Sequence, residues 1–392
     1  MIGHSVVSSR RVTTEASSSA RSRLAMTNVV RGGFRRPMAA VRTRRVAPQT
    51  AFSRPLRGYR GVVGDMARAL VLGGCGFVGG HLCERLLASG VEVVCVDDLS
   101  TSAPNAENLL RDHPGYRFVH HDITEPFTGP ALQDPFDVVF HLASPASPTD
   151  YLRLPVHTLH TGAMGTANAL EIAERHTARL VLASTSEVYG DPLEHPQPET
   201  YWGNVNPVGP RSVYDEAKRY AEALTFAHRR ERGADVGVAR IFNTYGPRMR
   251  SHDGRMVPTF IRQALAGEPI TVTGSGRQTR SLCFVDDTVE GLLALARSAY
   301  PGPVNLGNPH EVTVQHVAEL IRDLAAADSA IEFLPAVEDD PQRRCPDIAV
   351  AREHLGWEPR VPYRDGLAQT IEWFRSADAA SEYAVAHSKT AS

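Results

Sequence analysis

A glycine-rich turn between an apolar strand and a helix is the feature that most restricts how this chain of 392 residues can fold. Residues 69–72 read Ala-Leu-Val-Leu without polar alternation, as expected of a strand covered on both faces. Gly73, Gly76 and Gly79 follow in a GxxGxxG spacing, and a helical pattern then runs to Gly90. Because glycine has no side chain, such a turn is tight and lets the backbone approach a pyrophosphate at the helix N-terminus.

The end of the second predicted strand indicates which dinucleotide this turn would bind. The strand over residues 91–96 is followed by Asp97, close to the spacing of about 20 residues expected of an acid that accepts a ribose 2'-hydroxyl. A carboxylate there would repel a 2'-phosphate, so the sequence predicts NAD rather than NADP. Asp122 and Ile123 follow the third predicted strand and could flank the adenine, although Asp122 could equally be a plain loop acid.

Strands and helices alternate beyond the turn. Further strands are predicted at residues 117–119, 136–142, 180–183 and 236–242, and the notable helices between them at residues 156–175 and 214–232. This alternation predicts an α/β fold, a Rossmann-type doubly wound parallel sheet with right-handed crossovers.

The pattern becomes less regular after about residue 246. Helices are predicted there at residues 260–266, 287–298, 313–325 and 363–375, with a short strand at 270–272. We therefore expect an NAD-binding domain over residues 66–245 and a smaller substrate-binding lobe over 246–378. The two are expected to interleave, and residues 379–392 to form a flexible tail.

The first 65 residues differ in composition from the remainder. They hold 13 of the 42 basic residues and 2 of the 44 acidic ones, a net charge of +11, which leaves −13 for the rest of the chain. A transit peptide and a basic arm for nucleic acid are both possible interpretations. We favour a disordered or non-native extension, with Met66 as the true start, and expect no nucleic-acid partner for the acidic body.

Other patterns argue against a membrane, disulfides or a metal. No apolar run approaches the roughly 20 residues of a membrane span. The five cysteines form no CxxC pair and are odd in number, which is typical of reduced thiols in the cytoplasm. The chain has no HExxH motif, and His120 and His121 would point to opposite faces of a strand, so no metal site is predicted.

Residues 183–190 and a downstream Tyr/Lys pair supply the groups for moving a proton and a hydride. Tyr214 and Lys218 are four residues apart on a predicted helix and share one face. A neighbouring cation favours the phenolate, which makes Tyr214 a usable general base. Thr185 and Glu187 lie at the hydroxyl-rich end of the preceding strand.

Together these motifs resemble the extended short-chain dehydrogenase/reductase family, which acts on nucleotide sugars. Longer runs at residues 141–148, 183–192, 206–211 and 240–249 are similar to those of the UDP-glucuronate decarboxylases (UDP-xylose synthases). The resemblance covers about residues 67–375. It implies NAD as cofactor, a UDP-sugar as substrate and a homodimer that pairs through the two long helices in a four-helix bundle.

The resemblance also implies a reaction. Thr185 would hydrogen-bond the C4 hydroxyl of UDP-glucuronate while Tyr214, assisted by Lys218, removes its proton and hydride passes to NAD. The 4-keto sugar then loses CO2 from C5, the resulting enolate gains a proton at C5, and return of the hydride gives UDP-xylose and regenerates NAD. Glu187 would assist the decarboxylation, and Arg280 would bind the anionic groups or deliver a proton. A structural acid and surface salt bridges are the alternatives for these two residues.

Further positions are carried over from the matching motifs. The cofactor-binding positions are Gly73, Gly76, Phe77, Val78, Gly79, Asp97, Asp122, Ile123, Leu142, Ala143, Tyr214 and Lys218. The substrate-binding positions are Ser144, Tyr151, Asn243, Arg248, Arg255, Arg280 and Arg344.

Some residues depart from the pattern of the decarboxylases, and other functions of the same fold have to be weighed. Cys75 stands where relatives usually have Ala, Gly162 where they commonly have Asn, and Pro258-Thr259 replaces a usual Ser-Asn. A 4,6-dehydratase of the dTDP-glucose type needs an Asp directly before the glutamate, and this chain has Ser186. A 4-epimerase has no need of Glu187, and a non-catalytic NAD-binding sensor has no need of the complete Thr/Tyr/Lys set.

Overall fold

The computed structural model describes residues 66–336 and 343–376. Seven strands form one sheet in the order β11-β6-β5-β4-β1-β2-β3, and every neighbouring pair is parallel. The strands are β1 (Arg68–Leu72), β2 (Glu92–Asp97), β3 (Tyr116–His120), β4 (Val138–His141), β5 (Arg179–Thr185), β6 (Val236–Ile241) and β11 (Val304–Leu306). The predicted Rossmann-type fold is confirmed.

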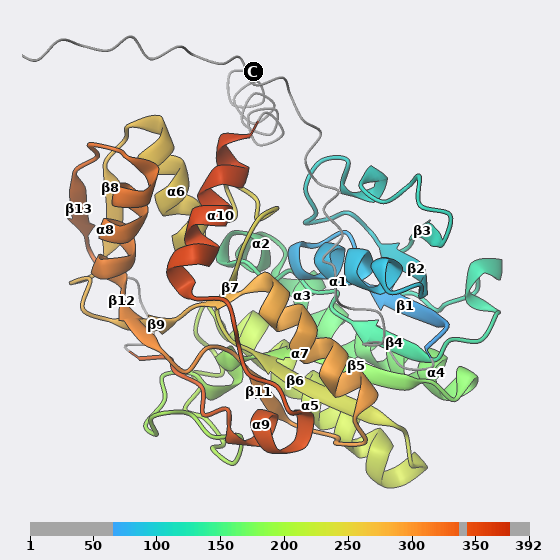
Figure 1. The fold of residues 1–392 in the computed structure, drawn as a ribbon. Helices are drawn as coiled ribbons and strands as arrows, with labels where there is room; N and C mark the ends of the chain where they lie inside the picture. Colours follow the sequence, from blue (N-terminus) through green and yellow to red (C-terminus); the bar gives the residue numbers. More distant parts are fainter. Residues whose placement is uncertain (1–65, 337–342, 377–392) are drawn as a thin grey trace, which may run out of the picture. The chain divides into compact units, whose positions relative to one another are not determined.

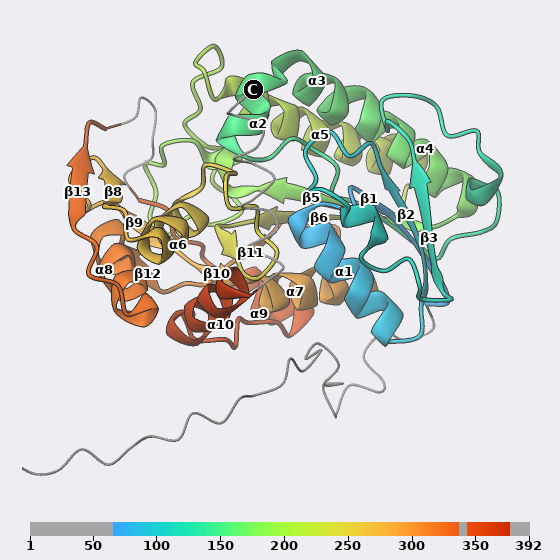
Figure 2. The same cartoon turned by 90° about the horizontal axis from the view of Figure 1, so that it is seen from above.

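Helices cover both faces of this sheet (Figures 1 and 2). On one side lie α1 (Phe77–Ala88) and α7 (Val285–Arg297), and on the other α3 (Pro155–His160), α4 (Thr166–His176) and α5 (Ser212–Arg232). Alternate residues of β1 point to the two sides. Ala69 and Val71 belong to the core that includes α1 and α7, whereas Leu70 and Leu72 pack with α4. The unbroken apolar run of β1 is therefore the consequence of burial on both faces.

The predicted helix at residues 156–175 is interrupted by one wider turn. Helical backbone runs from α3 into α4, but residues Thr161–Gly165 form a π-helical turn between them. A Cβ atom added to Gly162 would lie 2.7 Å from both the Cβ and the carbonyl oxygen of Ala217 in α5. Glycine is therefore required at position 162 by packing, because α5 approaches too closely to leave room for a side chain.

The remaining elements are short strand pairs and helices. The strand pairs are β8 (Ile270–Thr273) with β13 (Ile331–Leu334), β9 (Thr279–Ser281) with β12 (Glu311–Thr313), and β7 (Thr244–Tyr245) with β10 (Cys283–Phe284). The helices are α6 (Met256–Ala266), α8 (Val314–Ala325), α9 (Ala349–Leu355) and α10 (Tyr363–Arg375). Of these elements, α6, α8, β8 and β13 lie at the left of Figure 1 and α9 lies below β11. Both β11 and α7 come from the second half of the chain, but β11 is a strand of the large sheet and α7 packs on that sheet, so the two halves interleave. A domain boundary at residue 245 stays a prediction.

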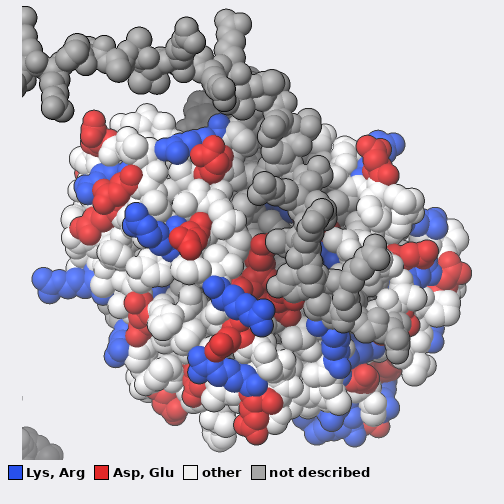
Figure 3. Space-filling view, viewed as in Figure 1, with Lys and Arg blue, Asp and Glu red and all other residues white. Residues whose placement is uncertain are grey.

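Charged side chains of both signs are interspersed over the face shown in Figure 3. Several form ion pairs, such as Arg85 with Glu290 at 2.6 Å and Arg262 with Glu268 at 2.7 Å. All five cysteines are buried and unpaired. Within the described ranges, no helix combines the length and apolar character that crossing a bilayer requires. The predictions for residues 1–65 and 379–392 lie outside the described residues.

The close approach at Gly162 generates a stability prediction. Gly162→Ala should lower the free energy of unfolding by about 1–3 kcal/mol, because the new methyl group forces α5 away from the π turn. Gly129→Ala is the matched control, since Gly129 has an ordinary extended backbone and nothing within 4 Å of an added Cβ. Urea unfolding of both variants checks this, and equal stabilities would contradict the packing argument.

Candidate active site

The glycine turn has the geometry of a dinucleotide site. Gly73 adopts φ +79°, which favours glycine, and its amide donates to the carbonyl of Val96 at 2.8 Å. A Cβ there would lie 2.6 Å from the backbone of Ala143, so the turn runs directly against the segment that follows β4. No side chain caps the N-terminus of α1 and its first turn holds no acid, which fits a helix end that receives a diphosphate.

Asp97, at the end of β2, connects the turn to the second strand. Its carboxylate accepts hydrogen bonds from the amides of Cys75 at 3.0 Å and Leu99 at 2.9 Å, and from Ser102 Oγ at 3.2 Å. Burial raises the pKa of Asp97 to about 6, and the backbone hydrogen bonds offset part of that rise. The group is therefore ionised at neutral pH, as a ribose-binding acid should be.

The other predicted adenine contacts lie after β3. Asp122 accepts the amide of Thr124 at 2.8 Å, and the carbonyl of Ile123 accepts Asn168 Nδ2 at 2.9 Å. The structure thus holds this loop against α4. The glycine turn, Asp97 and this loop all follow carboxyl ends of neighbouring strands, and together they fit NAD.

Thr185, Tyr214 and Lys218 are brought together as expected. Lys218 Nζ lies 5.9 Å from the centre of the Tyr214 ring and donates to the carbonyl of Ala183 at 2.9 Å. Burial lowers the pKa of Lys218 to about 8, although Glu222 acts in the opposite direction. Burial raises the pKa of Tyr214, and a hydrogen bond with Thr185 is the main effect that lowers it.

Tyr151 lies directly against the Tyr214 ring. The two rings stack with their centres 5.3 Å apart and their planes 9° apart. Tyr151 is carried by a short helix, α2 (Pro148–Arg153), which begins where the Ser147 side chain accepts the amide of Asp150. The predicted substrate residue Tyr151 therefore forms one wall beside the phenol.

Glu187 is held by two arginines. It lies in the 3-10 turn η4 (Ser186–Tyr189), where Arg344 binds both of its carboxylate oxygens at 2.7 and 2.9 Å and Arg211 binds Oε2 at 2.7 Å. Burial raises the pKa of Glu187, but the ion pairs with Arg344 and Arg211 outweigh it and lower the pKa to about 2. Glu187 is therefore a fixed carboxylate at neutral pH rather than a proton donor.

Two residues of this cluster were not among the predicted site residues. Arg211 belonged to a matching run, but nothing in its sequence context distinguished it from a surface arginine. Asp215 follows Tyr214 on α5 and is buried; burial and the nearby Glu187 raise its pKa to about 7. Its Oδ1 atom is buried and makes no hydrogen bond within the described residues. The position next to the tyrosine was the only available signal.

The predicted substrate residues do not all gather at this point. Arg255 lies close enough to Tyr214 to lower the pKa of that phenol, and it pairs with Asp253 at 3.4 Å. Asn243 has a buried Oδ1 atom without a hydrogen bond in the described chain, as expected of a group awaiting a ligand. Ser144, just after β4, donates to the carbonyl of Pro145 at 3.3 Å.

Two further predicted arginines contact groups outside the cluster of Thr185, Tyr214 and Glu187. Arg248 contacts α1 instead, through an ion pair with Glu84 and a 3.2 Å contact with His81 Nδ1. Arg280 lies in β9 and donates to the carbonyl of Thr279 at 2.8 Å. Substrate roles for Arg248 and Arg280 stay predictions.

A buried polar network lies behind the site and was not predicted. Ser184 donates to Glu222 at 2.6 Å, and Arg240 binds both oxygens of Glu222 at 2.9 and 2.7 Å. Arg240 also donates to the Tyr189 hydroxyl at 3.0 Å, which donates to Asn305 at 2.8 Å. Because Glu222 also raises the pKa of Lys218, this network helps to keep that lysine charged.

The fold is a parallel sheet with a glycine turn and a Thr/Tyr/Lys group at its carboxyl edge. This combination is typical of enzymes that use a nicotinamide dinucleotide. The sequence profile of the NAD dependent epimerase/dehydratase family matches residues 69–307, and the chain belongs to this family. UDP-glucuronic acid decarboxylase 1 of Danio rerio is 51% identical over 311 residues, which is 79% of this chain and 73% of that protein.

Two solved structures show the same fold. UDP-glucose 4-epimerase of Thermotoga maritima, with UDP-glucose, has a TM-score of 0.72 and 29% identity, covering 79% of this chain and 98% of that one. A double mutant of dTDP-glucose 4,6-dehydratase from Streptomyces venezuelae, with NAD bound, has a TM-score of 0.71 and 26% identity over 80% and 98% of the two chains. The resemblance seen in the sequence, and NAD as the cofactor, are confirmed.

The paired carboxylate generates a pH-dependent prediction. The pKa of Glu187 in the folded chain, about 2, lies below its ordinary value of 4.5, so the stability from its ion pairs is complete above pH 4.5 and is lost as pH falls toward 2. Glu187→Gln should therefore cost about 3 kcal/mol at pH 7, because it leaves two buried arginines without a countercharge. The difference from the unsubstituted chain should shrink between pH 4.5 and 2.

Glu268→Gln is the control for this measurement. Glu268 pairs with Arg262 at 2.7 Å but is half-exposed, so its loss should cost less than about 1 kcal/mol. Urea unfolding over this pH range provides the comparison. A Glu187→Gln penalty that does not change with pH would contradict the assigned ionisation.

Proposed function

We propose that this chain converts UDP-glucuronate to UDP-xylose and CO2, with NAD reduced and regenerated in each turnover. The observation that carries the proposal is the Thr185, Tyr214 and Lys218 group beside a Glu187 carboxylate that two arginines hold. Relatives about half identical to this chain carry the decarboxylase name, which supports the same reaction.

The first step is removal of a proton from the C4 hydroxyl of the sugar. Tyr214 is the base and Thr185, already hydrogen-bonded to it, orients the hydroxyl. Since burial disfavours the phenolate, the positive charge of Lys218 and Arg255 is needed near the ring. When bound, NAD supplies the hydride acceptor and a further positive charge beside the phenol.

Loss of CO2 follows from the position of the new ketone. A 4-keto group is β to the carboxylate on C5, so the electrons of the breaking C–C bond pass into an enolate without a metal. Arg211 and Arg344, with Glu187 between them, form an anion-binding region whose two positive charges are balanced by Glu187 and, in part, by Asp215, so that an excess of positive charge remains. A dehydratase would need an acid for the C6 hydroxyl, and buried Ser186 cannot supply one.

The proposal predicts a definite product. Incubation with UDP-glucuronate and NAD should yield UDP-xylose and CO2, detected by product mass and released gas, whereas dTDP-glucose should not be dehydrated. Tyr214→Phe should lower turnover by about 10²–10⁴ because the proton acceptor is lost. A folded, NAD-bound protein that releases neither product would contradict the proposal, and activity unchanged by Tyr214→Phe would indicate a different base.

We further propose a homodimer formed through the helices α3 and α5. These helices pack against each other on the outer face of the sheet. Large apolar side chains are exposed along this side of the chain, from α2 through the π turn to α5: Leu152, Val156, Leu159, Met164 and Tyr220. Exposed apolar residues gathered in this way are typical of a protein interface.

The dimer proposal predicts the effect of one charge. Val156, 62% exposed, should lie in the interface, so Val156→Glu should yield monomers of 42.7 kDa in light scattering after size-exclusion chromatography. Leu109→Glu, at an exposed leucine outside these helices, should leave the dimer intact. A dimer retained by Val156→Glu, or an unsubstituted chain that is monomeric, would contradict this interface.

We also propose a cytoplasmic location. Five buried cysteines without a disulfide support it, because thiols stay reduced in that compartment.

A further inference from the structure

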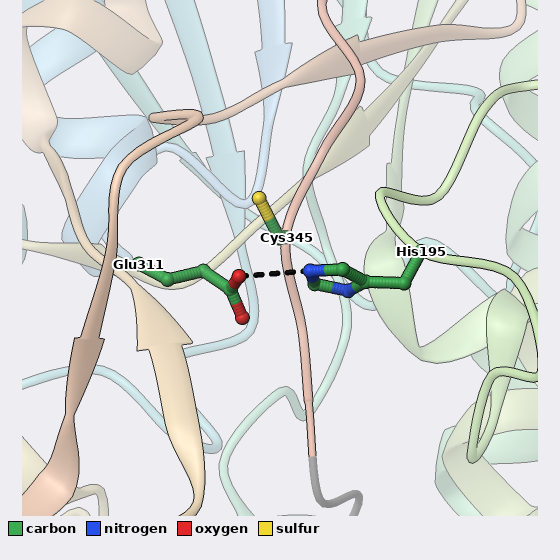
Figure 4. Close-up of side chains that lie close together, drawn as sticks. All are labelled: His195, Glu311 and Cys345. Carbon is green, nitrogen blue, oxygen red and sulfur yellow. Dashed lines mark hydrogen bonds and ion pairs between the residues drawn. The ribbon is translucent and has the colours of Figure 1, made fainter.

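Three side chains of metal-binding type converge at a point that the proposed reaction does not use (Figure 4). His195, Glu311 and Cys345 each offer one ligand atom, and these atoms all lie within 4.8 Å of one another. His195 Nε2 and Glu311 Oε2 are 2.8 Å apart. The three residues come from segments more than 30 positions apart in the sequence, which is why no motif spacing marked them.

The backbone around this cluster is held in place without a ligand. Glu311 lies in β12, opposite Ser281 of β9, and its side chain accepts a hydrogen bond from the Thr279 hydroxyl. Two hydrogen bonds of 2.8 Å join Gln197 to Cys345. The Gln197 backbone amide donates to the Cys345 carbonyl, and the Cys345 backbone amide donates to Gln197 Oε1. The positions of Glu311 and Cys345 are therefore set by strand pairing and backbone hydrogen bonds, and His195 is held by its side-chain contact with Glu311.

A buried hydroxyl beside the cluster is an independent indication of a ligand. Ser281 is fully buried, and its Oγ atom has no hydrogen bond of good geometry in the described chain. Directly opposed residues in a strand pair project to the same face, so this hydroxyl lies on the side of Glu311, and it also neighbours the Cys345 side chain. The Cys345 sulfur is therefore within reach of this hydroxyl, and a thiolate there would accept a stronger hydrogen bond from it than a thiol does.

We propose that His195, Glu311 and Cys345 form a Zn²⁺ site with water as the fourth ligand. Imidazole nitrogen, carboxylate oxygen and thiolate sulfur are the ligands that Zn²⁺ accepts in tetrahedral geometry. Cys345 releases its thiol proton to solvent on binding, and the imidazole proton moves to Nδ1. The Gln197 Nε2 amide, which lies 3.5 Å from Nδ1, must then move away because both groups are donors. One thiolate and one carboxylate balance the charge of the ion. Arg343, 3.7 Å from Glu311 Oε2, adds a positive charge, but its side chain is exposed to solvent.

A metal at this site would stabilise the segment that carries Arg344, a residue that binds Glu187. Cys345 directly follows Arg344, so a metal bound to Cys345 and Glu311 fastens the arginine-bearing segment to β12. Occupancy should therefore raise the temperature of unfolding. The inference does not depend on the proposed decarboxylase activity, because metal binding is measured without substrate.

Co²⁺ is a suitable probe, because a thiolate ligand produces a charge-transfer absorption band that carboxylate and imidazole ligands do not. The full chain, first treated with a chelator, should bind one equivalent of Co²⁺ with this band, and Zn²⁺ should displace it. Cys345→Ser should abolish the band, and Glu311→Gln should keep it but weaken binding by at least about 10-fold. Cys283→Ala, which removes a buried thiol outside the cluster, is the control and should leave the band unchanged.

Two results would contradict the proposed Zn²⁺ site. Absence of the band in the unsubstituted chain, or its persistence in Cys345→Ser, would overturn the site. If Cys345→Ser does not fold, as judged by circular dichroism, Glu311→Gln decides, because unchanged affinity in that variant also overturns it.

Discussion

Burial of both faces of the parallel sheet is the constraint on which the rest of the structure depends. It requires apolar residues at the four buried positions of β1 that follow Arg68, and it places the carboxyl ends of β1, β2, β4 and β5 at one edge. Gly73, Asp97 and Thr185 all follow or end these strands. The cofactor site and the proposed catalytic residues are neighbours because the sheet aligns the strand ends.

The charged residues at this edge of the sheet form two groups with different roles. Lys218, Glu222 and Arg240 form a buried network that keeps an ammonium group near Tyr214. Glu187 lies beyond it, between Arg211 and Arg344, where it is permanently ionised. In the proposed reaction, the first group serves oxidation at C4. The second gives the site its excess positive charge, which suits a substrate with a carboxylate and a diphosphate.

Local patterns predicted the parts of this structure that local sequence determines. The glycine turn, Asp97 and the Tyr214/Lys218 spacing each follow from a strand end or a helix period, and all three lie where expected. Strand β11 was missed because three residues, one of them Asn305, carry no usable periodicity. The π turn was missed because it depends on contact between Gly162 and α5 rather than on composition.

The other site residues were missed because they come together only in the folded chain, from segments far apart in the sequence. Arg211 and Arg344 lie far apart in the chain, and only the folded structure shows that both bind Glu187. The ionisation of Asp215 depends on its burial and on Glu187, neither of which its neighbours in the sequence reveal. The cluster of His195, Glu311 and Cys345 has the same origin, since a short motif describes none of its spacings.

In the proposed reaction, oxidation at C4 is temporary and the same hydride returns after CO2 is lost. UDP-glucuronate carrying deuterium at C4 tests this directly, with the mass of the UDP-xylose product as the measurement. The deuterium should be retained at C4 through the complete turnover. Loss of the label from the product, or formation of UDP-xylose without any involvement of C4, would contradict the proposed reaction.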